Sequence, residues 1–197
     1  ENVKNLVGKK FMPQFDEWLE YLESLGYKNQ WFILDAKDFG VPQSRERVFC
    51  VSILGEEPNL EIEKKELNFT IFDFLDKKVD DSYIKYLSGH LKGVYKNGAI
   101  RGRYNEQGEI EQKLELRDDG LSNTITTVKK DNVLVMDGKV RYFTEKECFR
   151  LMGLTEEEIL KISESGVSKS MQYKLAGNSI VVPVLEGVFY ALFVNNN

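Results

Sequence analysis

The stretch QWFILDAKDFGVPQSRERVFCVSIL, residues 30–54, sets two short apolar runs on either side of a polar loop. Residues 30–36 and 48–54 are rich in aromatic and branched side chains but too short for ordinary helices, which is typical of buried strands. Gly40 and Pro42 interrupt regular structure between the two runs. We therefore expect two strands joined by an irregular loop that carries two closely spaced arginines.

Amphipathic helices are expected on both sides of this stretch. Apolar residues between Lys9 and Leu25 recur every three or four positions, and Gly26 closes the pattern. Downstream, the Thr-x-x-Glu sequences at Thr144 and Thr155 have the form of capping boxes, which begin helices. The remaining expected helical segments are residues 71–75, 83–87, 168–175 and 181–194.

Residues 88–143 differ in character from the rest of the chain. Glycines recur there between short runs such as LSNTITTV and NVLVM, which favours irregular β structure with long loops. We expect an α/β protein in three parts. Residues 1–87 belong to an α/β domain, residues 88–143 form a small β-rich lobe, and residues 144–197 supply closing helices.

Composition narrows the class of protein. The 197 residues are 42% hydrophobic and 30% charged, the balance of a chain with a packed core. We expect no membrane span, because Pro183, Glu186 and Gly187 interrupt the longest apolar run well short of the about 18 residues that a membrane helix needs. The net charge of −5 gives no general attraction to nucleic acid, so any DNA contact must come from local placement of basic residues.

The cysteine and histidine content argues against several chemistries. Cys50 and Cys148 cannot form a disulfide framework, and with the single His90 they make no metal-binding pattern, so we expect no metal and a reducing cytoplasm. Both cysteines are expected in the core and not as nucleophiles, because one lies in an apolar strand and the other on a capped helix. The chain begins at Glu1 without Met or a leader, which suggests a truncated, processed or cut product.

Three polar clusters are candidates for function: residues 1–3 (ENV), 41–47 (VPQSRER) and 176–179 (AGNS). In the second cluster, Arg45 and Arg47 alternate where a strand begins. Guanidinium groups there could reach a phosphate or a carbonyl oxygen, or simply satisfy a sheet edge and nearby carboxylates. In the third cluster, a turn at a helix start either offers N–H groups to a polar ligand or acts as an ordinary cap.

Together with TEKECFRLMG at residues 144–153 and QYKLAGNS at residues 172–179, these clusters resemble in order and content the cytosine-5 DNA methyltransferase family. The resemblance covers nearly the whole chain. It implies the C-terminal part of a Rossmann-like methyltransferase domain with a truncated sheet, a target-recognition domain and closing helices. The family's Phe-x-Gly-x-Gly turn for the cofactor and its nucleophilic cysteine in a Pro-Cys context are absent from this sequence.

The resemblance also implies catalytic roles. Glu1 would bind the N3 and amino edge of a cytosine flipped out of the duplex, although a residue at a chain terminus is also often disordered. Arg47, or alternatively Arg45, would hold O2 of the base, and Gln43 belongs to the same Q-x-R-x-R signature.

The cofactor implied is S-adenosylmethionine, whose methionine portion Asn178 and Ser179 would contact; the rest of its site lies outside this chain. The implied partner is double-stranded DNA, and basic residues slightly outnumber acidic ones between residues 86 and 135. The candidates for DNA contact are Arg101, Arg103 and Arg117 for bases or phosphates, Thr124 for the backbone near the flipped base, and Lys129 and Lys130 for phosphates. Each of these residues also fits an ordinary solvated loop.

The leading hypothesis is a C-terminal fragment or subunit of a DNA (cytosine-5-)-methyltransferase of the restriction-modification kind, bacterial or phage-encoded and cytoplasmic. It would be inactive without a missing N-terminal half or a complementary subunit that carries the nucleophile. One alternative is a non-catalytic, sequence-specific DNA-binding module derived from that family. Another is a plain α/β fold with an inserted β lobe. An adjacent coding sequence that ends with the missing blocks would separate the first two.

Overall fold

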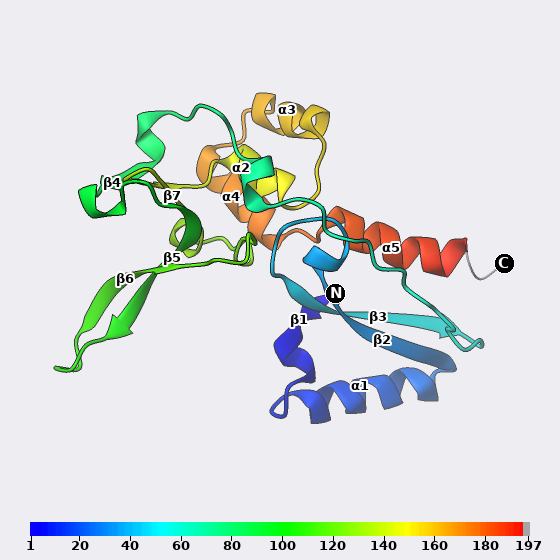
Figure 1. Ribbon diagram of the computed structural model, residues 1–197. Helices are drawn as coiled ribbons and strands as arrows, with labels where there is room; N and C mark the ends of the chain where they lie inside the picture. Colours follow the sequence, from blue (N-terminus) through cyan, green and yellow to red (C-terminus); the bar gives the residue numbers. More distant parts are fainter. Residues whose placement is uncertain (195–197) are drawn as a thin grey trace.

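The computed structural model describes residues 1–194 and contains two antiparallel sheets with helices packed on and between them (Figure 1). The strands are β1 (Asn2–Val3), β2 (Tyr27–Asp35), β3 (Glu46–Leu54), β4 (Ile84–Leu87), β5 (Tyr95–Tyr104), β6 (Ile110–Leu116), β7 (Val133–Met136) and β8 (Lys139–Tyr142). The α-helices are α1 (Met12–Ser24), α2 (Glu145–Arg150), α3 (Glu156–Glu164), α4 (Lys169–Asn178) and α5 (Val182–Phe193).

The first sheet has the order β1-β3-β2, and both of its pairings are antiparallel. Helix α1 lies on one face of this sheet and α5 on the other (Figure 1). The expectation of fully buried strands is wrong in part, because Trp31 and Ile33 of β2 are 36% and 40% exposed while Val48 and Phe49 of β3 are buried. The two expected strands are therefore present, but only the end next to the polar loop is enclosed.

The helix starts follow the local capping chemistry. Thr144 and Thr155 both form complete capping boxes, and Ser168 caps α4, as predicted. Helix α1 begins at Met12 and not at residue 9, because Pro13 occupies its first turn. Helix α4 continues to Asn178, three residues beyond the predicted end at residue 175.

The segment from Lys169 to Phe193 is long and apolar enough to cross a membrane by length and composition alone. The structure divides it, because α4 ends at Asn178 and α5 begins at Val182. The two helices have 10 and 12 residues, so neither reaches the about 20 residues that a bilayer requires. This break supports the expectation that the segment is not a membrane span.

The second sheet has the order β4-β8-β7-β5-β6 and forms the lobe. The expected helix over residues 83–87 is wrong: Ile84–Leu87 is strand β4, which pairs with β8 and turns Ile84 and Tyr86 inward. The lobe thus takes its edge strand from before the boundary drawn at residue 87, and the three-part division stays a prediction. Its own apolar cluster contains Leu91, Ile100, Val133, Val135 and Val140.

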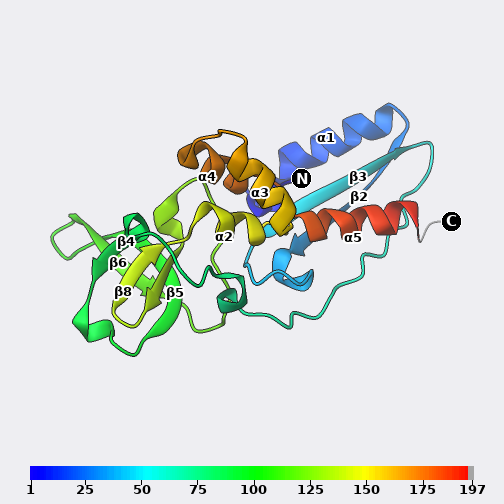
Figure 2. The ribbon, with the colours of Figure 1, turned by 90° about the horizontal axis from the view of Figure 1, so that it is seen from above.

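Strands β5 and β6 continue beyond the lobe as a two-stranded arm, here called the β5–β6 ribbon (Figure 1). The register places Arg101 opposite Lys113 and Arg103 opposite Glu111, and these four residues are exposed. Seen from above, the lobe and the first sheet lie at opposite ends of the molecule, with α2 between them (Figure 2). A single main core nevertheless joins the two parts, because it includes Ile125 and Leu134 of the lobe together with Leu34 and Phe49 of the first sheet.

Candidate functional site

Glu1 and Arg47 form an ion pair, with Arg47 Nε 3.1 Å from Glu1 Oε1. The pairing of β1 with β3 places them, since Val3 lies opposite Arg47 in the register. Their side chains are 18% and 17% exposed, so the exposure of Glu1 as a residue lies mainly in its terminal backbone. The structure therefore holds Glu1 in place, and the two residues expected to contact the base lie together.

Gln43 and Arg45 lie apart from this ion pair, in the interior. Gln43 is 0% exposed and Arg45 is 4% exposed. The guanidinium group of Arg45 donates to backbone carbonyls, of which Ile125 O at 2.7 Å is the nearest. Burial and the neighbouring charge of Arg47 lower the pKa of Arg45 to about 10, against a smaller opposing effect of Glu1. The charges of Arg47 and Glu1 thus affect the pKa of Arg45, although its side chain hydrogen-bonds to backbone carbonyls and not to either of them.

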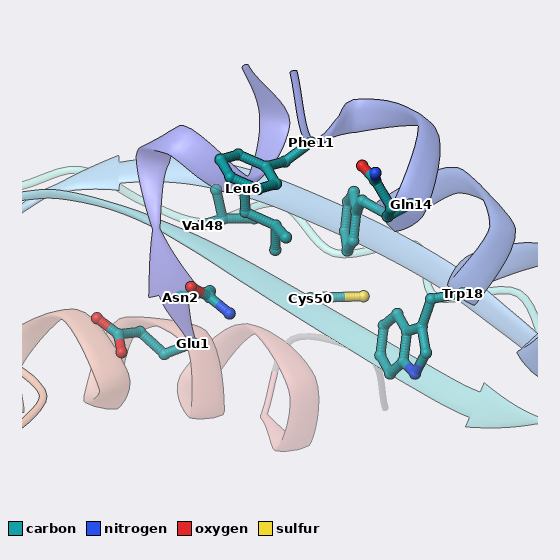
Figure 3. Close-up of a pocket in the computed structure, with 9 residues that line it drawn as sticks. Glu1, Asn2, Leu6, Phe11, Gln14, Trp18, Val48 and Cys50 are labelled. Carbon is teal, nitrogen blue, oxygen red and sulfur yellow. The ribbon is translucent and has the colours of Figure 1, made fainter. Parts of the chain in front are cut away.

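A largely apolar cavity of about 330 Å³, here called the α1 cavity, opens between α1 and the sheet next to Glu1 (Figure 3). Phe11, Trp18 and Cys50 are among the residues that line it. Burial raises the pKa of the Cys50 thiol, which has only Ser52 Oγ at 3.9 Å as a hydrogen-bond partner. Cys50 therefore shares a cavity with Glu1, and burial outweighs the opposing effects of Ser52 and of the N-terminal charge on the pKa of its thiol.

Cys148 is also unsuited to nucleophilic chemistry. It is 4% exposed on α2, and burial together with the negative charges of Glu147 and Glu145 raises the pKa of its thiol. Both cysteines are thus unionised at neutral pH. Cys148 lies in the core as predicted, whereas Cys50 is half-buried and lines the α1 cavity, which corrects its predicted place in the core. Within residues 1–194, no group of three His, Cys, Asp or Glu side chains is placed to hold a metal ion.

A polar cleft of about 390 Å³ lies where the lobe meets the loop before β3. We call it the Thr124 cleft, and it is lined by Ser44, Arg101, Arg117, Asn123, Thr124, Thr126 and Asp131. It brings together three of the candidate DNA contacts. Thr124 Oγ1 donates to Ser44 O at 2.8 Å, and Arg117 is held by Asp119 and by Asn123 Oδ1 at 3.0 Å.

Three other candidate DNA contacts do not line this cleft. Arg103 pairs with Glu115 across the β5–β6 ribbon. Lys129 lies 4.2 Å from the ring centroid of Tyr173, and Lys130 Nζ donates to Gln112 Oε1 at 3.4 Å. These basic groups are exposed on the lobe but are separated from the group around Thr124.

Among the other polar residues of the Thr124 cleft, Ser44 lies in the predicted 41–47 cluster, whereas no role was predicted for Asn123, Thr126 or Asp131. Thr126 Oγ1 donates to Asp131 Oδ2 at 2.7 Å, and Asn123 Nδ2 donates to Asp131 O at 3.0 Å. The run of Asn and Thr around residues 123–127 was the only signal available. An irregular loop has no periodicity from which these contacts could be deduced.

Asn178 and Ser179 lie at the end of α4, which corrects their expected place at a helix start. The Ser179 N–H and hydroxyl groups both donate to Ala176 O, so neither is offered to a ligand. The side chain of Asn178 is exposed and carries an amide donor and acceptor that suit an amino acid group. Of the two residues expected to contact the cofactor, Asn178 is therefore the one whose side-chain polar groups are exposed.

Solved structures with a similar arrangement are α/β methyltransferases. The Dnmt2 methyltransferase of S. pombe superposes with a TM-score of 0.69 at 23% identity, over 100% of this chain and 66% of that one. The Entamoeba histolytica methyltransferase EhMeth gives a TM-score of 0.64 at 20% identity, over 93% and 58% of the two chains. The fold of this chain thus matches part of a methyltransferase fold.

Sequence comparison defines the family. The family model "C-5 cytosine-specific DNA methylase" matches residues 1–193, and the chain belongs to this family. It is 40% identical to the Type II methyltransferase M2.ScrFI of Lactococcus lactis subsp. cremoris over 98% of this chain and 53% of that protein. It is 31% identical to M.SsoII of Shigella sonnei over 95% of this chain and 50% of that protein. The chain spans about half the length of these relatives.

Proposed function

We propose that this chain is the C-terminal portion of a DNA (cytosine-5-)-methyltransferase. The complete enzyme would transfer a methyl group from S-adenosylmethionine to C5 of a flipped cytosine in a specific site of double-stranded DNA. The observation that carries this proposal is the Glu1–Arg47 ion pair, whose two side chains are those that the family resemblance assigns to the base. The chain alone is inactive, because neither of its cysteines has the surroundings of a nucleophile.

The chemistry explains why a carboxyl and a guanidinium group belong side by side. C5 of cytosine is a poor nucleophile until a thiolate adds at C6, and that addition requires the ring to take up electron density at N3 and O2. Glu1 would hydrogen-bond the N3 and amino edge while Arg47 donates to O2. A duplex buries those edges, so the base must be flipped out. S-adenosylmethionine supplies the methyl group when bound, and Asn178 would hold its methionine portion.

The lobe would bind the duplex that contains the target base. Arg101, Arg117 and Thr124 meet in the Thr124 cleft, next to the loop that leads to Arg47. Arg103, Lys129 and Lys130 would contact phosphates on either side. Guanidinium groups recognise guanine edges and phosphates with paired hydrogen bonds, so arginines held in a cleft are suited to reading a sequence.

The relatives named above support a role in a bacterial restriction-modification system. M2.ScrFI and M.SsoII are described as Type II methyltransferases of bacteria. We place this chain in the same class, as part of a restriction-modification methyltransferase that acts in the bacterial cytoplasm. Its partner would be a segment with the cofactor turn and the nucleophilic cysteine, either on the same polypeptide or on a separate one.

A chimera tests the proposal directly. This chain would replace the part of the Lactococcus lactis methyltransferase that it matches, and incorporation of labelled methyl groups into mixed-sequence DNA would be measured. We expect methylation by the chimera, none by the chain alone, and none by a chimera whose supplied cysteine is changed to serine. A chain that methylates DNA by itself, or a folded chimera that does not, would overturn the proposal.

The second candidate is a DNA-binding module without catalysis. The Thr124 cleft favours it, since the polar and basic residues that line the cleft all belong to this chain. Site-specific DNA binding by the chain, together with a folded chimera that never methylates, would select this alternative.

A further inference from the structure

The loop before β3 and the lobe are joined by two short extended segments that run parallel. Ser122 N donates to Pro42 O at 2.8 Å, and Ser44 N donates to Ser122 O at 3.0 Å. This backbone ladder stops after Ser44. The next contacts between the segments are made by side chains.

Those contacts satisfy both polar groups of the Ile125 peptide. Ile125 N donates to Gln43 Oε1 at 2.8 Å, and Ile125 O accepts from Arg45 Nη1 at 2.7 Å. Gln43 Nε2 in turn donates to Leu151 O at 2.6 Å, which ties the same side chain to the end of α2. Ile125 is 1% exposed, so water does not compete for these bonds.

Arg45 also fixes a third segment. Its Nη2 donates to Ser179 O at 2.9 Å and to Gly177 O at 3.3 Å. A Cβ atom at Gly177 would lie 2.5 Å from the backbone of Thr126 and Thr127, so the end of α4 rests directly on the lobe segment. The loop before β3, the segment after Thr124 and the turn after α4 therefore meet at one guanidinium group.

Stability alone does not explain a charge at this place. Within residues 1–194, Arg45 forms no ion pair with a carboxylate, and its buried Nε has no acceptor. Burying a guanidinium group in this way is costly, and an apolar side chain would fill the same volume at lower cost. A planar group that donates to three carbonyls is instead suited to holding three segments at fixed positions.

The same segment carries the residue that pairs with Glu1. Gln43, Arg45 and Arg47 alternate along an extended chain, so their side chains share one side of it. Ile125 directly follows Thr124, which lines the cleft. A shift of the Ile125 peptide would therefore displace the Thr124 cleft relative to Arg47.

We propose that Gln43 and Arg45 are positioning residues: by gripping the Ile125 peptide, they hold the DNA-binding cleft of the lobe in register with Arg47 and Glu1. As far as the reaction is concerned, this rests on the function proposed above. The hydrogen bonds from Gln43 and Arg45 to the Ile125 peptide lie within this chain, so their role in holding it can be tested without measuring activity.

The first test is amide hydrogen exchange on the 197-residue chain, read residue by residue. The variants are Gln43→Met and Arg45→Met, with Gln107→Met in the exposed β5–β6 turn as the matched control. We expect exchange at Ile125 to rise about tenfold or more, while the amides of Val133 and Val135 in the core of the lobe stay as protected as before. Unchanged exchange at Ile125, or loss of protection throughout the lobe, would overturn the proposal.

The second test measures kinetics in the chimera. Because small displacements of reacting groups are costly, we expect Arg45→Met to lower kcat about 100-fold while KM for DNA changes by less than about threefold. Arg45→Lys, which keeps the charge and one donor group, should recover part of kcat. A rise in KM at constant kcat, or no recovery with lysine, would contradict positioning. An inactive parent chimera would count against the proposed function. Hydrogen exchange would still decide whether Gln43 and Arg45 hold the Ile125 peptide in place.

Discussion

Arg47 Nε lies 3.1 Å from Glu1 Oε1: Arg47 belongs to β3, and Glu1 directly precedes β1, the strand that pairs with this part of β3. The carboxylate and guanidinium groups therefore lie together in the folded chain, as the proposed function requires. Such pre-arranged groups stabilise developing charge without reorganising during the reaction.

Replacing Arg47 by alanine should slow methylation at every site. Loss of one preorganised donor to the base oxygen costs about 100-fold to 1,000-fold in rate. Arg47→Lys should recover little, because a single ammonium group cannot pair with Glu1 and the base in the same way. Single-turnover methylation of several DNA sequences by the chimera measures this effect. A change in which sequence is methylated would contradict a role confined to the target base.

Arg101→Ala and Arg117→Ala should weaken DNA binding or relax site preference. Both residues line the Thr124 cleft, and Asp119 and Asn123 orient Arg117 within it. A lost contact to a base edge costs about 1–3 kcal/mol at that position, whereas a lost phosphate contact weakens binding to all sequences equally. Titrations with matched and altered DNA sites distinguish the two. Lys161→Ala on α3 is the control. If it weakens DNA binding as much as the two arginine variants do, the Thr124 cleft has no specific role in DNA recognition.

The thiols should resist alkylation at pH 8. Burial raises the pKa of Cys50, so its thiolate appears at higher pH than that of a cysteine in an unfolded peptide. Cys148 is more deeply buried and should react only after unfolding. Iodoacetamide labelling followed by mass analysis, with and without urea, measures both. Rapid labelling of either cysteine in the folded chain would show a reactive thiol and reopen the question of a nucleophile within this chain.

Glu147→Ala should destabilise the chain by about 3–5 kcal/mol, because it leaves Arg141 charged and buried without its partner. The Glu147 carboxylate also accepts from Thr144 N at 2.7 Å and from Asp76 N at 2.8 Å, so the alanine removes several bonds at once. Urea unfolding provides the measurement. Glu157→Ala, on an exposed pair, should change stability by less than about 1 kcal/mol. Similar losses in both variants would show that the buried pair has no special importance.

Local features of this fold could be predicted from the sequence, because local interactions produce them. Thr144 and Thr155 begin helices through bonds to residues three positions away, and a sequence pattern records such bonds. Ile84–Leu87 was predicted as helix because a short apolar run fits either structure. It becomes a strand only by pairing with β8, which lies far along the chain.

The site shows the same division. The family resemblance named Glu1 and Arg47, which the structure places in contact. The burial of Arg45 depends on carbonyls of Ile125, Gly177 and Ser179, which are distant in sequence and carry no side-chain signal. Backbone acceptors are present at every residue. A sequence therefore cannot show which of them a buried arginine will bind.

If the lobe binds DNA as proposed above, the exposed β5–β6 ribbon could change the length of DNA contacted without changing the core. Residues 101–104 of β5 and 110–113 of β6 are all exposed. Inserting or deleting cross-strand residue pairs near Gly108 would lengthen or shorten the ribbon by one pair at a time. Under the proposed function, selection could thus alter how much DNA beside the target is contacted, while Glu1 and Arg47 remain under separate constraint.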